Sequence, residues 1–187
     1  MKIRTHTCGE LNINSIQKTV VLNGWVNTIR LHGQVVFVDL RDRYGKTQIV
    51  FNSEDYSKDF DQVKKLSMED VISITGKVQN RSEGAINPDM TTGEVEVMVS
   101  KMEKLNEAAP LPFIISDRNS AEEDLRLKYR YLELRTDELQ RNLNIRHKTY
   151  QVVRNYLSSH SFLEVETPVL MKSTPEGARD YLVPSRI

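Results

Sequence analysis

Hydrophobic and polar residues alternate through most of the first 106 residues. The alternation marks five stretches rich in β-branched side chains: 19–30, 34–42, 46–52, 70–79 and 94–100. A period of two with one apolar face predicts β-strands that each bury one side. Residues 57–69 instead carry Phe60, Val63 and Leu66 at helical spacing, so we expect a helix between the third and fourth strands.

The order of these elements, three strands, a helix and two strands, narrows the fold. It favours a β-rich domain of the OB type, a five-stranded Greek-key barrel, over a generic small β-barrel. Residues 109–117 follow with two prolines and little charge, which is typical of a linker. We therefore expect an OB-fold domain over 1–106, a hinge over 107–120 and the start of a second domain over 121–187.

The second half of the chain changes from alternating to helical periodicity. Apolar side chains fall on one stripe at spacings of three, four or seven: Leu139, Leu143, Tyr150, Val153 and Leu157. This pattern predicts a helix over 137–159 that buries the stripe. Asp137, followed three residues later by Gln140, resembles a capping box at its start. The apolar run FLEVETPVL then predicts a strand over 162–170.

Composition excludes several classes of protein. The 187 residues carry 26 Lys or Arg and 26 Asp or Glu, so nucleic-acid binding needs a local patch rather than overall positive charge. A single cysteine excludes an internal disulfide and suits a reducing cytoplasm. No apolar run approaches the ~18–20 residues of a membrane span. The four histidines and Cys8 lack zinc-ligand spacing, and neither glycine-rich phosphate-binding motif is present.

One face of the predicted barrel carries candidate nucleic-acid chemistry. The strand VVFVDLR places Phe37 on its polar side, and we expect Arg30, Arg41, Arg43 and Gln48 to flank the ring. An exposed ring offers a base a stacking platform worth ~1–3 kcal/mol, cations bind phosphates, and an amide reads a base edge. Alternation alone leaves a second interpretation open, in which Phe37 belongs to the core and the arginines pair with nearby aspartates.

Two charged segments of the second half each leave two interpretations open. Residues 124–154 hold eight Lys or Arg against four Asp or Glu, which fits either a face that follows a polyphosphate or a solvated helix with intrahelical pairs. In STPEGARD (173–180), Gly177 lets a loop approach a ligand, and Glu176 can accept hydrogen bonds from an ammonium group. The alternative is an exposed turn with an Arg–Asp pair.

Seven stretches together resemble a known family: RTHTCGEL, LNGWV, FVDLRDRYGKTQIVF, NPDMTTGEVEV, LRLKYRYLELR, FLEVETPVL and STPEGARDYLVPSR. Over almost its whole length the chain resembles the bacterial-type aspartyl-tRNA synthetases. LRLKYRYLELR is shared with class II synthetases for lysine and asparagine, whereas STPEGARDYLVPSR is much narrower. The resemblance implies an N-terminal OB barrel that binds the tRNA anticodon, a hinge, and the start of an α+β class II catalytic domain on an antiparallel sheet.

The resemblance also implies roles for individual residues. Phe37 corresponds to the aromatic residue that stacks on the middle anticodon base, and Gln48 to the amide that reads it. The other positions that line this pocket are Arg30, Arg81 and Glu96. Pro168 lies in a segment similar to class II motif 1, which builds the dimer interface. Glu176 resembles the contact to the α-ammonium group of aspartate.

The chain departs from the family's pattern near the anticodon. The segment Thr28-Ile29-Arg30 stands where other members often have an arginine cluster, so we expect weaker attraction for phosphate. Ala85 replaces an asparagine that faces the anticodon in some members, which puts readout there in doubt. His32 and Gly84 resemble the residues of members that charge both tRNA-Asp and tRNA-Asn.

The family attaches L-aspartate to tRNA-Asp through aspartyl-adenylate, with ATP and Mg as substrates, in a cytoplasmic homodimer. Motifs 2 and 3, which supply the ATP-binding arginines and the magnesium carboxylates, are absent from the 187 residues. We therefore expect the N-terminal part of an aspartate–tRNA ligase, which binds the anticodon of tRNA-Asp, and of tRNA-Asn where charging is relaxed. No catalytic residue, metal site or bound cofactor is expected in it, and it should be inactive alone.

A second interpretation belongs to a different class of protein. The chain would be a stand-alone OB-fold protein that binds single-stranded nucleic acid and dimerises through a helical tail. The loop STPEGARD favours the ligase, because a stand-alone binder has no use for an aspartate lid. Neither interpretation involves a membrane.

Overall fold

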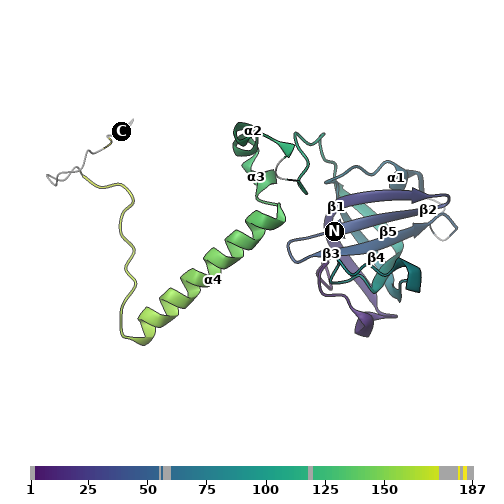
Figure 1. Cartoon of the computed structure of the whole chain (residues 1–187), viewed down its shortest axis with the longest axis horizontal. Helices are drawn as coiled ribbons and strands as arrows, with labels where there is room; N and C mark the ends of the chain where they lie inside the picture. Colours follow the sequence, from purple (N-terminus) through teal and green to yellow (C-terminus); the bar gives the residue numbers. More distant parts are fainter. Residues whose placement is uncertain are drawn as a thin grey trace. The chain divides into compact units, whose positions relative to one another are not determined.

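The computed structural model describes residues 3–54, 56, 60–117, 120–172, 181 and 183–184. The chain forms two compact units, residues 1–140 and residues 141–187. The first unit holds a β-barrel and a short helical segment, and the second holds most of one long helix and the chain that follows it (Figure 1).

Five strands close into a barrel in the first unit (Figure 1). They are β1 (Thr19–His32), β2 (Val35–Arg41), β3 (Lys46–Asn52), β4 (Val71–Asn80) and β5 (Val95–Asn106), with α1 (Phe60–Lys64) between β3 and β4. The order around the barrel is β1-β2-β3-β5-β4, in which β3 and β5 are parallel and the other pairs are antiparallel. The OB-type order that the sequence predicted is confirmed.

The barrel interior is apolar because the strands alternate as the sequence predicted. Val36, Val38 and Leu40 of β2, and Ile49 and Phe51 of β3, are at most 1% exposed. One cluster joins them to apolar residues of β1, β4, β5 and α1. Full burial of such a side chain contributes ~1.5–3 kcal/mol. This core decides which side chains of each strand remain on the outer face.

The helix α1 ends at Lys64, earlier than the limit at residue 69 that helical spacing predicted. Glu69 has a left-handed backbone φ of 68°, which turns the chain toward β4. Among the described residues outside the strands are the 3-10 turns η1 (Ile13–Ser15), before β1, and η2 (Glu83–Ala85), between β4 and β5.

Asp70 anchors the chain that leaves the barrel. Its buried carboxylate accepts hydrogen bonds from Ser67 N at 2.9 Å and Ala108 N at 2.8 Å, and it pairs with Lys104 at 2.9 Å. Burial raises the pKa of Asp70, but the two backbone donors and Lys104 together act more strongly, so the pKa lies below its usual value. Residue 108 is thereby tied to the turn that precedes β4.

Two short helices follow in the same unit: α2 (Glu123–Lys128) and α3 (Arg130–Glu133). Glu133 is 1% exposed, and its carboxylate pairs with Arg126 at 3.0 Å and with Arg130. A second apolar cluster beside them contains Phe113, Ile115 and Leu132. The segment therefore has a small core of its own.

An aromatic and ionic cluster joins this segment to the barrel. The guanidinium carbons of Arg135 and Arg41 lie 4.6 and 5.5 Å from the centre of the Trp25 ring. Glu69, which is 6% exposed, accepts a hydrogen bond from Arg135 Nη1 at 2.7 Å and another from Arg41 Nη2. We call these four residues the junction cluster.

The helix α4 runs over Asp137–Ser159, as the sequence predicted. Its start differs, because Thr136 Oγ1 accepts the hydrogen bond from Leu139 N at 3.4 Å. Gln140 Nε2 donates to a backbone carbonyl of the preceding turn instead of reaching back to a cap. Thr136 is therefore the capping residue, and the predicted capping box of Asp137 and Gln140 is wrong.

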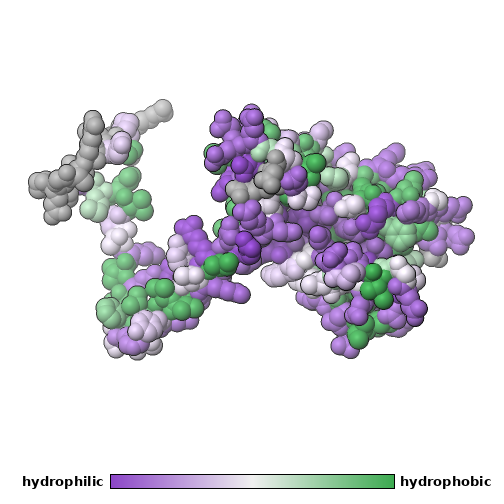
Figure 2. All heavy atoms as spheres, viewed as in Figure 1, coloured by the Kyte–Doolittle hydropathy of each residue, from purple (hydrophilic) through white to green (hydrophobic). Residues whose placement is uncertain are grey.

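The apolar stripe of α4 is not buried. Leu143, Tyr150, Val153 and Leu157 are 41–49% exposed, and Figure 2 shows apolar side chains gathered over the last turns of the helix and the chain after it. The predicted strand over 162–170 is absent as well, because no strand in the described part of the chain pairs with it. Over the same residues, no helix combines the length and apolarity that crossing a bilayer requires.

Candidate nucleic-acid interface

Phe37 lies on the outer face of the barrel, in the middle of β2. Its strand neighbours Val36 and Val38 point inward and are fully buried, whereas Phe37 is half-buried and lies outside the core cluster. Its ring makes a T-shaped contact with the His32 ring, with 6.0 Å between ring centres and 74° between planes. The interpretation of Phe37 as core is therefore wrong, and its ring is available as a platform.

A chain of polar contacts crosses all five strands beside this ring. It runs Asp39–Arg30–Gln48–Glu96–Gln79, from β2 through β1, β3 and β5 to β4. Arg30 donates to both oxygens of Asp39, at 3.0 and 2.9 Å, and to Gln48 Oε1 at 3.0 Å. Glu96 accepts from Gln48 Nε2 at 2.7 Å and from Gln79 Nε2 at 2.8 Å. We call these five residues the polar chain.

The polar chain fixes the chemistry that the face presents. Arg30 is held in a two-pronged pair with Asp39, so its charge is neutralised before any phosphate arrives. Its remaining role is to orient Gln48, which is 7% exposed and whose amide has one N–H and one carbonyl lone pair outside these contacts. The face can therefore stack a base and read its edge.

Arg81 closes one side of the face. It is 7% exposed, and its Nε donates to Val95 O at 3.1 Å while its other nitrogens reach Ala85 O at 3.4 Å and Met90 Sδ at 3.8 Å. Burial lowers the pKa of Arg81, and the nearby Glu96 carboxylate partly opposes that shift. Its side chain holds the η2 loop against β5.

Two of the predicted flanking cations lie elsewhere. Arg41 donates to Glu69 and to Asn27 Oδ1 at 3.1 Å, and so belongs to the junction cluster rather than to the face around Phe37. Arg43 lies over the Tyr44 ring at 5.8 Å, in the turn between β2 and β3. The prediction that both flank Phe37 is wrong, because buried and aromatic partners elsewhere hold them.

Sequence reasoning missed Gln79. Its residue type gave no signal, and its importance comes from the β4–β5 register, which sets Gln79 opposite Glu96. A correct strand alignment would have found it, since cross-strand neighbours on one face lie within reach of each other.

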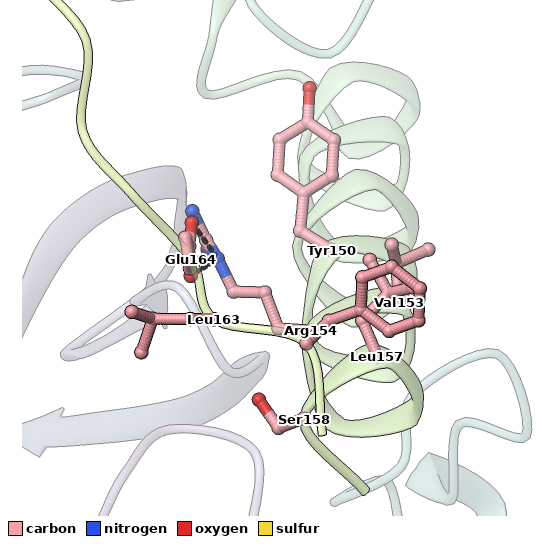
Figure 3. Close-up of a pocket in the computed structure, with 8 residues that line it drawn as sticks. Tyr150, Val153, Arg154, Leu157, Ser158, Leu163 and Glu164 are labelled. Carbon is pink, nitrogen blue, oxygen red and sulfur yellow. Dashed lines mark hydrogen bonds and ion pairs between the residues drawn. The ribbon is translucent and has the colours of Figure 1, made fainter. Parts of the chain in front are cut away.

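The two candidate residues of the second half belong to the second unit. Pro168 is exposed in the irregular chain after α4. Glu176 lies outside the described residues. In the same unit, a groove of about 330 Å³ lies between α4 and the chain that follows it, and is lined by Tyr150, Val153, Arg154, Leu157, Ser158, Phe162, Leu163 and Glu164 (Figure 3). Arg154 and Glu164 pair across it at 2.9 Å.

Two family profiles match the chain. Residues 20–105 match the family described as "OB-fold nucleic acid binding domain" and residues 122–187 match "tRNA synthetases class II (D, K and N)". The first profile covers the barrel, and the second begins just before α2.

Curated relatives agree with both profiles. "Aspartate--tRNA(Asp/Asn) ligase" of Salinibacter ruber is 52% identical over 98% of this chain, and the protein of the same name from Oleidesulfovibrio alaskensis is 55% identical over 98%. The chain spans about 30% of the length of these relatives.

Solved structures give the same fold. An asparaginyl-tRNA synthetase of Pyrococcus horikoshii aligns with a TM-score of 0.80 and 26% identity, over 95% of this chain and 39% of that protein. An aspartyl-tRNA synthetase of Entamoeba histolytica aligns with a TM-score of 0.79 and 26% identity, over 91% of this chain and 41% of that protein. The chain is therefore similar, over 98% of its length, to the N-terminal part of aspartate–tRNA ligases, and two segments of it match the OB-fold nucleic-acid-binding and class II synthetase families.

Proposed function

We propose that the outer barrel face binds the anticodon loop of tRNA-Asp, as the RNA-recognition part of an aspartate–tRNA ligase. Phe37 stacks on the middle anticodon base and Gln48 reads its edge, while Arg30, Arg81 and Glu96 hold the surrounding side chains in place. The observation that carries this proposal is the half-exposed ring of Phe37 next to an amide whose orientation is fixed from both sides.

The chemistry of the face suits a splayed single strand. Single-stranded RNA is recognised by stacking on aromatic rings and by hydrogen bonds to base edges, which these two side chains supply. Its arginine is already paired, and the chain as a whole has zero net charge. Base contacts therefore contribute more to affinity here than phosphate contacts do.

The chemical steps of the reaction require the whole ligase. We propose that it joins L-aspartate to tRNA through aspartyl-adenylate, with ATP and Mg as substrates, in the cytoplasm. Glu176 contacts the α-ammonium group of aspartate, and residues 1–106, 107–120 and 121–187 form the anticodon-binding domain, the hinge and the start of the catalytic domain. The 187 residues alone are inactive, so an ATP–pyrophosphate exchange assay should give no signal; measurable exchange would contradict this.

The apolar stripe of α4 and the segment around Pro168 form a homodimer interface in this proposal. An exposed apolar stripe along a helix is a typical contact surface between copies of a chain. The polar faces of α4 stay solvated.

Charging of tRNA-Asn is a second element of the proposal. The relatives named above carry the name "Aspartate--tRNA(Asp/Asn) ligase". His32 makes a T-shaped contact with the Phe37 ring, and Gly84 is exposed in η2. Both positions resemble those of members that charge both tRNAs, and we propose that they lie near the third anticodon base. Aminoacylation of a tRNA-Asn transcript by the full-length enzyme tests this point, and a lack of charging would contradict it.

A titration tests the central proposal. The 187-residue chain is titrated with tRNA-Asp, with a tRNA of unrelated anticodon, and with an unrelated single strand. We expect a preference for tRNA-Asp, and Phe37→Ala should weaken its binding about fivefold to 150-fold, because one stacking contact is worth ~1–3 kcal/mol. Equal affinity for all three ligands would instead favour a general single-strand binder.

A further inference from the structure

Gln79 is the residue of the polar chain farthest from Phe37, at the end of β4. We propose that it is a positioning residue that lets the face discriminate between uracil and cytosine at the middle anticodon position. This inference rests on the proposed anticodon function and adds the source of its pyrimidine selectivity.

The Gln48 amide has one allowed orientation. Arg30 has only donors, and an ionised Glu96 has only acceptors, so the Gln48 carbonyl must face Arg30 and its NH₂ must face Glu96. A flipped amide would set donor against donor and acceptor against acceptor. The two charged neighbours therefore act as a lock on the amide.

The orientation of the amide decides which pyrimidine fits. Uracil presents an acceptor at its C4 substituent beside a donor at N3, whereas cytosine presents a donor at C4 beside an acceptor at N3. An amide in one orientation matches the first pair of groups, and the flipped amide matches the second. A locked Gln48 thus selects one base, and a freely flipping Gln48 would accept both.

Gln79 completes the lock from the far side. The Glu96 carboxylate has two oxygens, of which Oε2 faces Gln48 at 2.7 Å and Oε1 faces Gln79 at 2.8 Å. Because Glu96 is only half-buried, the second hydrogen bond, together with the nearby charge of Arg81, restrains its carboxylate from turning toward water. Gln79 is set opposite Glu96 by the β4–β5 register, so the contact needs no movement of the backbone.

The experiment compares anticodon stem-loops of tRNA-Asp with uracil or cytosine at the middle position. Binding of each to the 187-residue chain is measured by fluorescence anisotropy for wild type, Gln79→Ala and Gln79→Glu. We expect the ratio of the two affinities to fall severalfold, by about tenfold at most, in both variants, because the Glu96 side of the lock is loosened while Arg30 still faces the Gln48 carbonyl and stacking remains. Gln62→Ala, an exposed glutamine of α1, is the matched control and should keep the wild-type ratio.

A merely structural role of Gln79 would give a different result. It would weaken both stem-loops equally and leave the ratio unchanged, and that outcome, or no change at all, overturns the inference. A wild-type chain that binds neither stem-loop, or binds both equally, would instead overturn the proposed function itself.

A second measurement needs no RNA. The Gln48 side-chain amide protons, assigned by their disappearance in Gln48→Glu, should exchange with solvent faster in Gln79→Ala than in wild type. Equal exchange rates would show that Gln79 does not hold the lock.

Discussion

The junction cluster should carry a measurable part of the stability of the first unit, and Glu69→Gln is the change that tests this. The substitution keeps the shape of the side chain but removes the negative charge between Arg41 and Arg135. Glu69 is 5% exposed at its side chain, and its two partners are 11% and 27% exposed. Two guanidinium groups would then lie against the Trp25 ring without a counter-charge.

The magnitude follows from this burial. Removal of one member of a buried ion pair typically costs ~3–5 kcal/mol, because the remaining charge stays desolvated. Arg135 is partly exposed and can turn toward water, so we expect the lower end, about 3 kcal/mol. For a chain of this length that loss corresponds to a fall in Tm of about 6–12 °C.

Urea unfolding followed by circular dichroism, together with thermal unfolding, measures the effect. Glu83→Gln removes the same charge from an exposed position in η2 and should change stability by less than about 0.5 kcal/mol. If Glu69→Gln is as stable as that control, the cluster contributes nothing and the reasoning is wrong. Arg135→Ala should cost less than Glu69→Gln, because it leaves Glu69 paired with Arg41.

Three further expectations concern other parts of the first unit. Because the pKa of Asp70 is lowered, its stabilising effect is present above the usual carboxyl pKa and lost as the pH falls through the folded value; urea midpoints should therefore drop below about pH 4 in wild type and much less in Asp70→Asn. Gly93→Ala should destabilise the chain by about 2 kcal/mol in the same assay, since a Cβ there would lie 1.7 Å from Asn87 O. Arg30→Ala should weaken anticodon binding about tenfold but leave the slope of log K against log salt almost unchanged, because Arg30 is already neutralised; a slope smaller by about one would contradict this.

The strands and their inward faces could be predicted because alternation is a local property. Val36, Val38 and Leu40 occupy every second position of β2, and this spacing alone predicts which face of the strand is buried. The element order then selected the barrel. Helix α4 was equally predictable from its period, although its cap at Thr136 depended on which residue first becomes helical.

The site was predictable only in part because it depends on contacts between strands. Phe37 and Gln48 could be placed on the outer face, but their setting comes from partners brought in by register. Gln79 was invisible for that reason, and Arg41 was misplaced because the partner that holds it, Glu69, precedes β4 in a left-handed turn. A long side chain pairs with the most favourable partner within its reach, and the alternation of apolar and polar residues does not identify that partner.

The polar chain straddles the closure of the barrel. β3 and β5, the parallel pair that closes it, match at two register positions, Ile49 with Val97 and Val50 with Met98. The contact of Gln48 with Glu96 spans this same pair. Since the contact cannot form until β5 has docked on β3, the RNA-reading amide is oriented only in the closed barrel. Changes that loosen the closure should therefore reduce base selectivity before they reduce the strand content of the other four pairs.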